Sequence, residues 1–205
     1  MKATKTIPVI TLLLALVALG GCKTYIHFRY GISPPKPETP ESLLKFLARH
    51  DYPAGRQYLF ADSGSYFAAM RHPLFRKNLL GTMIFDSSGR LIMRDTARCQ
   101  WAGYDRIANL SRDSTYPITE ELTLGFLLPR IRPFGPGRSP GDTLAAPGFT
   151  VLINWGKFMG TVNGRLFSQE KAVDGNPNAR IRLIWLNADM QESWNLPREQ
   201  RMELR

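Results

Sequence analysis

Two cysteines, at positions 22 and 99, are the side chains of this 205-residue sequence best suited to covalent chemistry. Cys99 follows Arg98 and lies close to Arg94, just ahead of a helical pattern. Positive neighbours and a helix N-terminus lower the pKa of a thiol, as a one-cysteine peroxidase or redox sensor requires. The alternative is a small buried side chain, because free cysteines are among the most buried residues. Cys99 is the one candidate catalytic residue.

The other residue types show no pattern of a catalytic or metal site. Three histidines are scattered without ligand spacing, so neither a metal nor another cofactor is expected. The sequence has no phosphate loop, nucleophile elbow or zinc-protease helix motif. Asp62 and the serines after it are typical of a helix start rather than of an acid and its nucleophile. The domain is therefore expected not to be an enzyme, unless Cys99 acts.

The first 22 residues have the pattern of an export signal that ends at the other cysteine. Lys2 and Lys5 give a positive start, and the apolar run 7–19 is shorter than the roughly 20 residues of a membrane-spanning helix. Two glycines then stand directly before Cys22. The run Leu19-Gly20-Gly21-Cys22 resembles the lipobox of bacterial lipoproteins, which implies a signal peptide over 1–21. An ordinary secretory signal beside a cysteine is the alternative.

The lipobox resemblance also implies where the protein is held. It implies diacylation of Cys22, whose acyl chains make membrane lipid a partner. Lys23 is not acidic, so the inner-membrane retention signal of enterobacterial lipoproteins is absent, and no acidic surface-export cluster follows. These features favour an outer-membrane anchor that faces the periplasm, where an envelope protein is a further possible partner.

The net charge and length limit the class of the mature protein. Removing 21 of 205 residues leaves 184, which suits one domain, and the formal charge of +10 falls to +8 without Lys2 and Lys5. The export signal and the scattered basic residues argue against a nucleic-acid partner. We expect a solvated basic surface near anionic lipid or cell wall. With Cys22 acylated, Cys99 has no partner for an internal disulfide.

Residues 22–110 predict a tether followed by the first half of a single domain, 39–205. The tether, 22–38, ends in a proline-rich stretch that cannot be helical. The predicted elements are a helix from Thr39-Pro40 to near Asp51, a strand over 57–60, a helix over 63–70 capped by Asp62, a hairpin of 82–85 and 91–93 with Gly89 in its turn, and a short helix over 104–110.

The remaining residues predict a parallel pair of strands after a long loop. Five prolines and four glycines make 129–148 a loop, either functional or a plain connector. The apolar run 149–155 is typical of a strand buried on both faces. The other predicted elements are a helix over 118–128, a helix over 159–170, a strand over 180–186 that pairs parallel with the first, and a last helix from Asp189 to Pro197.

Residues 151–163 resemble the active-site segment of thioredoxins, in which an apolar strand runs into two aromatics and a Cys-Gly-Pro-Cys turn that opens a helix. Trp155 and Phe158 match the aromatics and Gly160 the glycine, whereas Met159 and Val162 stand where the cysteines would be. Leu-Asn-Ala-Asp at 186–189 resembles the end of the next thioredoxin strand. The hairpin segment 81–85 resembles a later segment of thioredoxins, in which a cis-proline and a threonine precede an apolar strand. Gly81 stands in place of the cis-proline.

The resemblance implies an α/β, thioredoxin-like three-layer sandwich with a changed order of elements. In the family the hairpin follows the active-site helix, whereas here it precedes it. Either the fold is circularly permuted, or the halves 57–110 and 149–196 each supply part of one sheet. Asp189 beside Asn187 could act in a polar site or cap a helix.

The missing cysteines decide the expected function. Thioredoxin chemistry needs a thiolate and a resolving cysteine, and Met159 and Val162 provide neither. We therefore expect a redox-inactive binding or assembly module in the cell envelope. Its possible binding surface, past the end of a parallel strand, is formed by Trp155, Phe158, Met159, Gly160 and Asn163.

Three alternatives stay open. Trp101, Trp185 and Trp194 could extend that surface, or all these aromatics could belong to the core. A thiol enzyme acting through Cys99 is the second possibility. The third is a structural envelope component whose basic tether and long loop touch lipid or wall polymer.

Overall fold

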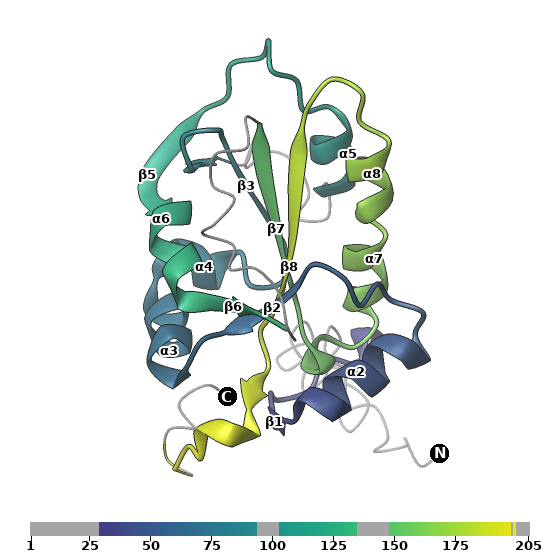
Figure 1. Cartoon of the computed structure of the whole chain (residues 1–205), viewed down its shortest axis with the longest axis vertical. Helices are drawn as coiled ribbons and strands as arrows, with labels where there is room; N and C mark the ends of the chain where they lie inside the picture. Colours follow the sequence, from purple (N-terminus) through teal and green to yellow (C-terminus); the bar gives the residue numbers. More distant parts are fainter. Residues whose placement is uncertain (1–28, 94–102, 135–147, 198, 200–205) are drawn as a thin grey trace, which may run out of the picture.

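The computed structural model is a mixed α/β fold built on one large sheet (Figure 1), and it describes residues 29–93, 103–134, 148–197 and 199. The elements in chain order are β1 (Pro37–Glu38), α2 (Pro40–Arg49), β2 (Gln57–Phe60), α3 (Ser63–Arg71), α4 (Pro73–Lys77), β3 (Thr82–Phe85), β4 (Arg90–Ile92), α5 (Gly103–Ala108), β5 (Ile118–Thr123), α6 (Leu124–Leu127), η1 (Leu128–Arg130), β6 (Ile131–Pro133), β7 (Phe149–Trp155), η3 (Lys157–Met159), α7 (Val162–Phe167), α8 (Glu170–Asp174), β8 (Ile181–Asn187), β9 (Met190–Gln191) and η4 (Glu192–Trp194).

Within these ranges seven strands pair in the order β5-β4-β3-β7-β8-β2-β6, and β1 pairs separately with β9. Four of the six pairings in the large sheet are antiparallel. Helices α3, α4 and α6 cover one face, and α2, α5, α7 and α8 cover the other (Figure 1). None of the helices in the described ranges combines the length and apolar character needed to span a bilayer.

The strands β7 and β8 form the centre of the sheet. They pair in parallel over seven positions, from Phe149 opposite Ile181 to Trp155 opposite Asn187. Every residue of β7 is buried, as expected for an apolar strand covered by helices on both faces. The sequence predicted both strands and their parallel pairing, and the structure confirms them.

The hairpin β3–β4 lies on one side of this pair, and β2 lies on the other. β3 runs antiparallel to β7, and β2 runs parallel to β8. Gly89 turns the hairpin with a φ of +78°, the left-handed region that glycine enters without steric cost. The two halves of the chain therefore each supply part of one sheet, one of the two arrangements expected from the sequence.

Two predicted helix starts are confirmed in detail. The Thr39 hydroxyl accepts a hydrogen bond of 3.2 Å from the backbone nitrogen of Ser42, and Pro40 takes the first helical position of α2. Asp62 Oδ1 accepts one of 2.7 Å from the backbone nitrogen of Ser65 at the start of α3. The predicted helix over 104–110 corresponds to α5.

The predicted helix over 118–128 is wrong in its first half. Residues 118–123 form the edge strand β5, and only 124–127 are helical, as α6. Ile118 and Thr119 pair with β4, where β-branched side chains suit a strand. Thr123 then ends the strand and caps α6, because its hydroxyl accepts a 3.2 Å hydrogen bond from the Phe126 nitrogen.

Three other predictions also need correction. The helix over 159–170 is divided into η3, α7 and α8. Gly160, with a φ of +55° that no right-handed helix contains, separates η3 from α7, and residues 168–169 separate α7 from α8. The helix expected from Asp189 is the strand β9, which pairs with β1, followed by the single turn η4. The start of the predicted loop 129–148 contains β6, paired with β2, while 135–147 lie outside the described residues.

Candidate functional site

Buried polar side chains gather where β7 and β8 end. Asn187, Asp189 and Gln191 expose at most 3% of their surface. Asp189 Oδ2 accepts hydrogen bonds from Asn187 Nδ2 at 2.9 Å and from the backbone nitrogen of Lys157 at 2.8 Å. Gln191 Nε2 donates to the carbonyl oxygen of Asp189 at 3.1 Å. These bonds tie the chain after β8 to the turn after β7.

The Asp189 carboxyl is the most perturbed acid of this cluster. Burial raises its pKa to about 6, although hydrogen bonds from Asn187 and from the Lys157 backbone favour the charged form. Among the described residues, Asp189 Oδ1 has no hydrogen-bond donor. Burial, and secondarily the charge of Asp189, raise the pKa of Tyr66. Asp189 can therefore hold a proton near neutral pH, but with 1% exposure it meets no substrate in this conformation.

Asn163 closes the turn between β7 and α7 from inside. Its Nδ2 donates to the carbonyl oxygens of Gly156 at 2.8 Å and Gly160 at 3.1 Å, and its Oδ1 accepts from the Gly156 nitrogen at 3.3 Å. The side chain has no exposed surface. Asn163 thus supplies the hydrogen bonds that this irregular backbone cannot make to itself.

The N-terminal segment lies directly over this turn. The Ser33 nitrogen donates to the Phe158 carbonyl oxygen at 2.8 Å, and the Thr161 nitrogen donates to the Tyr30 carbonyl oxygen at 2.8 Å. A Cβ at Gly160 would lie 2.1 Å from that Tyr30 oxygen. Glycine at 160 is thus required both by its φ and by the close approach of this segment.

The N-terminal segment makes a second set of contacts at Pro37 and Glu38, four to five residues after Ser33. Pro37 and Glu38 pair in parallel with Met190 and Gln191, and Glu38 Oε2 lies 2.5 Å from Lys157 Nζ. The tether predicted over 22–38 therefore needs correction. From residue 30 onward, hydrogen bonds and an ion pair make it part of the folded body.

This covering changes the predicted binding surface. Trp155, Met159 and Asn163 have no exposed surface, Phe158 exposes 8%, and Gly160 is partly exposed beside the backbone of residues 30 and 31. The structure brings the five residues together as predicted, but as a closed interior. An open groove there was the wrong expectation, because the sequence pattern did not reveal that 30–38 fold back over it.

The tryptophans fit the core alternative. The Trp155 and Trp185 side chains are fully buried, and Phe167 of α7 packs between them with ring centroids 5.7 Å and 4.5 Å away. Trp194 is partly buried and lies 5.3 Å from the ring of Tyr66. Cys22, Cys99 and Trp101 lie outside the described residues.

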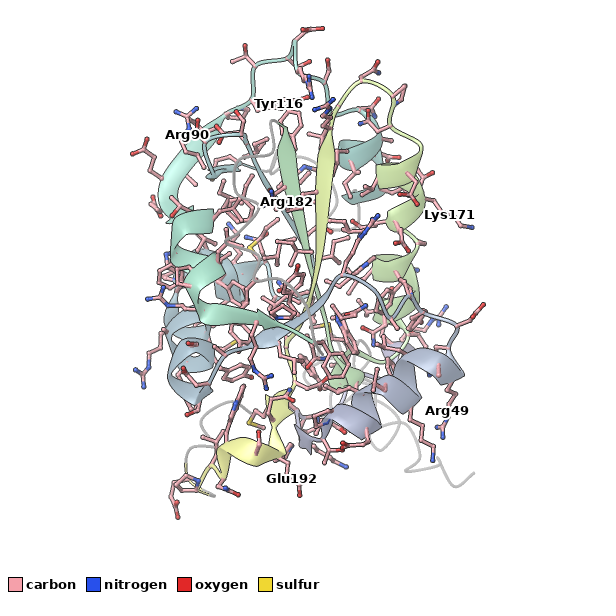
Figure 2. All side chains as sticks on the ribbon, in the orientation of Figure 1. Arg49, Arg90, Tyr116, Lys171, Arg182 and Glu192 are labelled. Atoms are coloured by element: carbon pink, nitrogen blue, oxygen red, sulfur yellow. The ribbon has the colours of Figure 1, made fainter. Side chains whose placement is uncertain are left out.

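An open cleft of about 660 Å³ lies at the opposite end of the sheet, where β7 begins. Arg90 on its wall is paired with Asp86 at 2.8 Å, and Tyr116 packs edge-on against Phe149 with ring centroids 5.7 Å apart. Hydroxyls of Ser87, Ser114 and Thr115 complete a mixed polar and aromatic lining. Figure 2 shows Arg90 and Tyr116 at this end, and Arg49 and Glu192 at the other.

Sequence reasoning found parts of these sites. It noted Asn187 and Asp189 as a polar pair but missed Gln191, which bonds to both within four positions. It also missed Glu38 and Lys157, which are distant from each other in sequence. It missed the cleft, whose walls come from the β3–β4 turn, the segment before β5 and the start of β7. Within the described ranges, no group of three or more His, Cys, Asp or Glu side chains could hold a metal ion.

Comparisons with known proteins add no assignment. No protein-family model, no curated protein and no solved structure matches this chain. The function must be argued from the residues and their geometry.

Proposed function

We propose that this chain is a bacterial lipoprotein that presents a redox-inactive, thioredoxin-like binding or assembly module in the cell envelope. Acyl chains on Cys22 anchor it, and the outer membrane facing the periplasm is the proposed site. The support for the anchor is the positive start, the short apolar run and the Leu-Gly-Gly-Cys sequence at 19–22.

The sheet supports the thioredoxin-like part of the proposal. The parallel strands β7 and β8 are joined through α7 and α8, and the hairpin β3–β4 adds antiparallel at the other edge of β7. The sequence resemblance implies that the corresponding strand of thioredoxins has the same two neighbours. In that family, however, the hairpin comes from later in the chain. Here the hairpin precedes β7, so the two halves of the chain each supply part of the sheet.

The observation that carries the redox-inactive part is the burial of Met159 and Val162. Both side chains have no exposed surface, and residues 30–33 are hydrogen-bonded over the turn that contains them. Disulfide exchange needs an exposed thiolate and a second cysteine that resolves the mixed disulfide. Two buried apolar side chains give neither, so this end of the fold acts as structure.

The cleft beside β7 is the proposed place of binding. It is open, it is lined by both hydrogen-bonding and aromatic groups, and it lies at the end of the sheet opposite residues 30–38 (Figure 2). An anchor at one end leaves a cleft at the other end accessible from the compartment.

Photo-crosslinking in intact cells tests the binding role. A crosslinking amino acid at Thr115, exposed in the cleft, should give an adduct of defined mass, whereas the same group at exposed Lys171 on α8 should not. Equal capture from both positions, or none from Thr115, contradicts binding through the cleft.

A reductase assay tests the proposed absence of redox activity. The purified full chain should not reduce insulin disulfides in the presence of dithiothreitol above the reagent alone. Turnover that is lost in Cys99→Ser would overturn the proposal in favour of a thiol enzyme.

A further inference from the structure

The docked N-terminal segment limits how far the folded body can stand from an anchor at Cys22. Hydrogen bonds from Ser33 and to Tyr30 fix the chain against the turn after β7. Seven Cα–Cα steps separate Cys22 from Arg29, and a fully extended chain covers about 25 Å in that number. The end of the body at which Arg29 emerges therefore stays within about 25 Å of the membrane.

Three parts of the chain come together at this end, beside β9 and η4. The segment 30–38 contacts the start of α7, where Arg165 lies over the Tyr30 ring at 5.5 Å. α2 packs beside α7, with Tyr52, just after α2, stacked on Phe167 at 4.1 Å. Figure 1 shows α2 and the start of α7 together at the end of the sheet away from β5 and α5.

The charges exposed here are mainly positive. Within 29–51 and α7, the exposed charged side chains are five basic and two acidic, while Glu38 is neutralised by Lys157. η4, at the same end, adds the exposed acidic Glu192. We name these basic residues the basic end: Arg29, Lys36, Lys45, Arg49 and Arg165. The two exposed acidic residues in the same ranges are Glu41 and Asp51.

The outward face of α2 adds an apolar contact to this charge. Its exposed residues Glu41, Leu44, Lys45, Ala48 and Arg49 have the spacing of one helical face, with two basic side chains and one acidic side chain on it. Leu44 exposes 48% of its surface although it is a large apolar side chain. An apolar side chain flanked by long basic ones suits the boundary between lipid headgroups and water.

We infer that the basic end rests on the anionic headgroups of the membrane that holds the acyl chains, with the face of α2 against the lipid. The inference depends on the proposed acylation of Cys22, because the short tether brings the two surfaces together. Lipid anchorage then also orients the body, and the cleft beside β7 points away from the bilayer. A second copy of the chain is a poorer occupant, because two basic ends repel each other.

Acetylation of lysines measures this contact in the intact protein. The full acylated protein is placed in vesicles containing phosphatidylglycerol, treated from outside with a membrane-impermeant acetylating reagent, and analysed by mass spectrometry. The ratio of acetylation at Lys45 to that at Lys77, exposed on α4, should fall about threefold or more relative to detergent. High salt should restore it, because surface charges are then screened.

Charge reversal separates orientation from anchoring. Lys45→Glu combined with Arg49→Glu should raise the Lys36 to Lys77 ratio on these vesicles toward its value in detergent. The matched control Lys171→Glu, on exposed α8, should leave that ratio unchanged. Loss of two contacts between basic side chains and anionic headgroups corresponds to about a 30-fold lower affinity of this face for the membrane surface.

The contradicting outcomes are distinguishable. If the protein floats with the vesicles but the Lys45 to Lys77 ratio equals that in detergent, the inference fails and the anchor stands. If the Cys22 peptide carries no acyl chains and the protein does not float, the proposed function and the inference both fail. Equal protection on phosphatidylcholine vesicles would overturn the role of anionic lipid.

Discussion

The ring of Phe46 in α2 lies nearly parallel to the indole of Trp155 in β7, with 6.0 Å between centroids and 8° between planes. This stack joins the helix at the N-terminal end of the fold to the central strand. Phe46→Ala should lower the free energy of unfolding by about 2–4 kcal/mol, because it leaves a cavity against a buried tryptophan. Urea unfolding followed by tryptophan fluorescence measures the loss. The control Leu44→Ala, at an exposed position of α2, should change stability by less than about 0.5 kcal/mol.

Gly160→Ala should release the N-terminal segment. Its φ of +55° with a ψ of −133° is a conformation that residues with a side chain rarely adopt and that costs about 1–3 kcal/mol, and the new Cβ would meet the Tyr30 oxygen at 2.1 Å. The variant should therefore be less stable to urea, and trypsin should cleave after Arg29 faster than in the wild type.

Gly164→Ala is the matched control for that glycine. A Cβ at Gly164, inside α7, would lie 3.5 Å from the Tyr52 hydroxyl, an ordinary contact. Helix propensity predicts a gain of about 0.5–1 kcal/mol. Equal trypsin rates in both variants would contradict the docking of residues 30–33.

Asp189 should make stability depend on pH. Its pKa in the folded chain, about 6, lies above the ordinary 3.8, so between these pH values the folded chain holds more protons than the unfolded chain. The contribution of this group is fully present below pH 3.8 and is lost as pH rises through 6. The loss is about 3 kcal/mol.

Asp189→Asn removes that titration. Relative to the wild type, the variant should gain about 3 kcal/mol of unfolding free energy between pH 3 and pH 7.5. Unfolding in urea at a series of pH values measures the difference. Asp174→Asn, at an exposed position, is the control and should follow the wild type. An Asp189→Asn curve parallel to the wild type would show that the carboxyl is not perturbed.

Restoring two cysteines should not restore thioredoxin chemistry. In a Cys99→Ser background, Met159→Cys with Val162→Cys places both thiols where the native side chains have no exposed surface. Native alkylation monitored by mass spectrometry should be slow, and insulin should not be reduced. Ser87→Cys, at an exposed position in the cleft, should react at the rate of a free thiol. Rapid alkylation at 159, or reductase activity, would show that residues 30–33 leave this site open.

The sequence predicted elements whose signals are local. Thr39-Pro40, Asp62 and Gly89 each determine a helix cap or turn within a few residues, and all three are found as expected. The apolar run of β7 predicted a strand buried on both faces for the same reason. The strand over 118–123 was missed because its alternation is weak and its partner, β4, lies about 30 residues away.

The candidate site was harder to predict because distant contacts decide its accessibility. Trp155 and Met159 were found from the thioredoxin resemblance, yet distant residues cover them. Phe46 stacks on Trp155 from more than 100 positions earlier, and Tyr30 and Ser33 are bonded over the turn that contains Met159 from more than 120 positions earlier. Glu38 and Lys157 are likewise 119 positions apart. No local pattern reports such pairs, and a proline-rich stretch gives the same signal whether it folds back or stays extended.

The interleaving of the two halves has a consequence for biogenesis. β3 reaches its inner neighbour β7 only across some 70 residues, and β2 reaches β8 across more than 120. A chain that emerges from its N-terminus therefore delivers β2 and the hairpin long before the strands that join them. Until residue 187 has appeared, the early strands have unpaired backbone edges that favour aggregation. Such a polypeptide should mature late and depend on holding chaperones, and a truncation before β8 should be degraded rather than accumulate as a stable fragment.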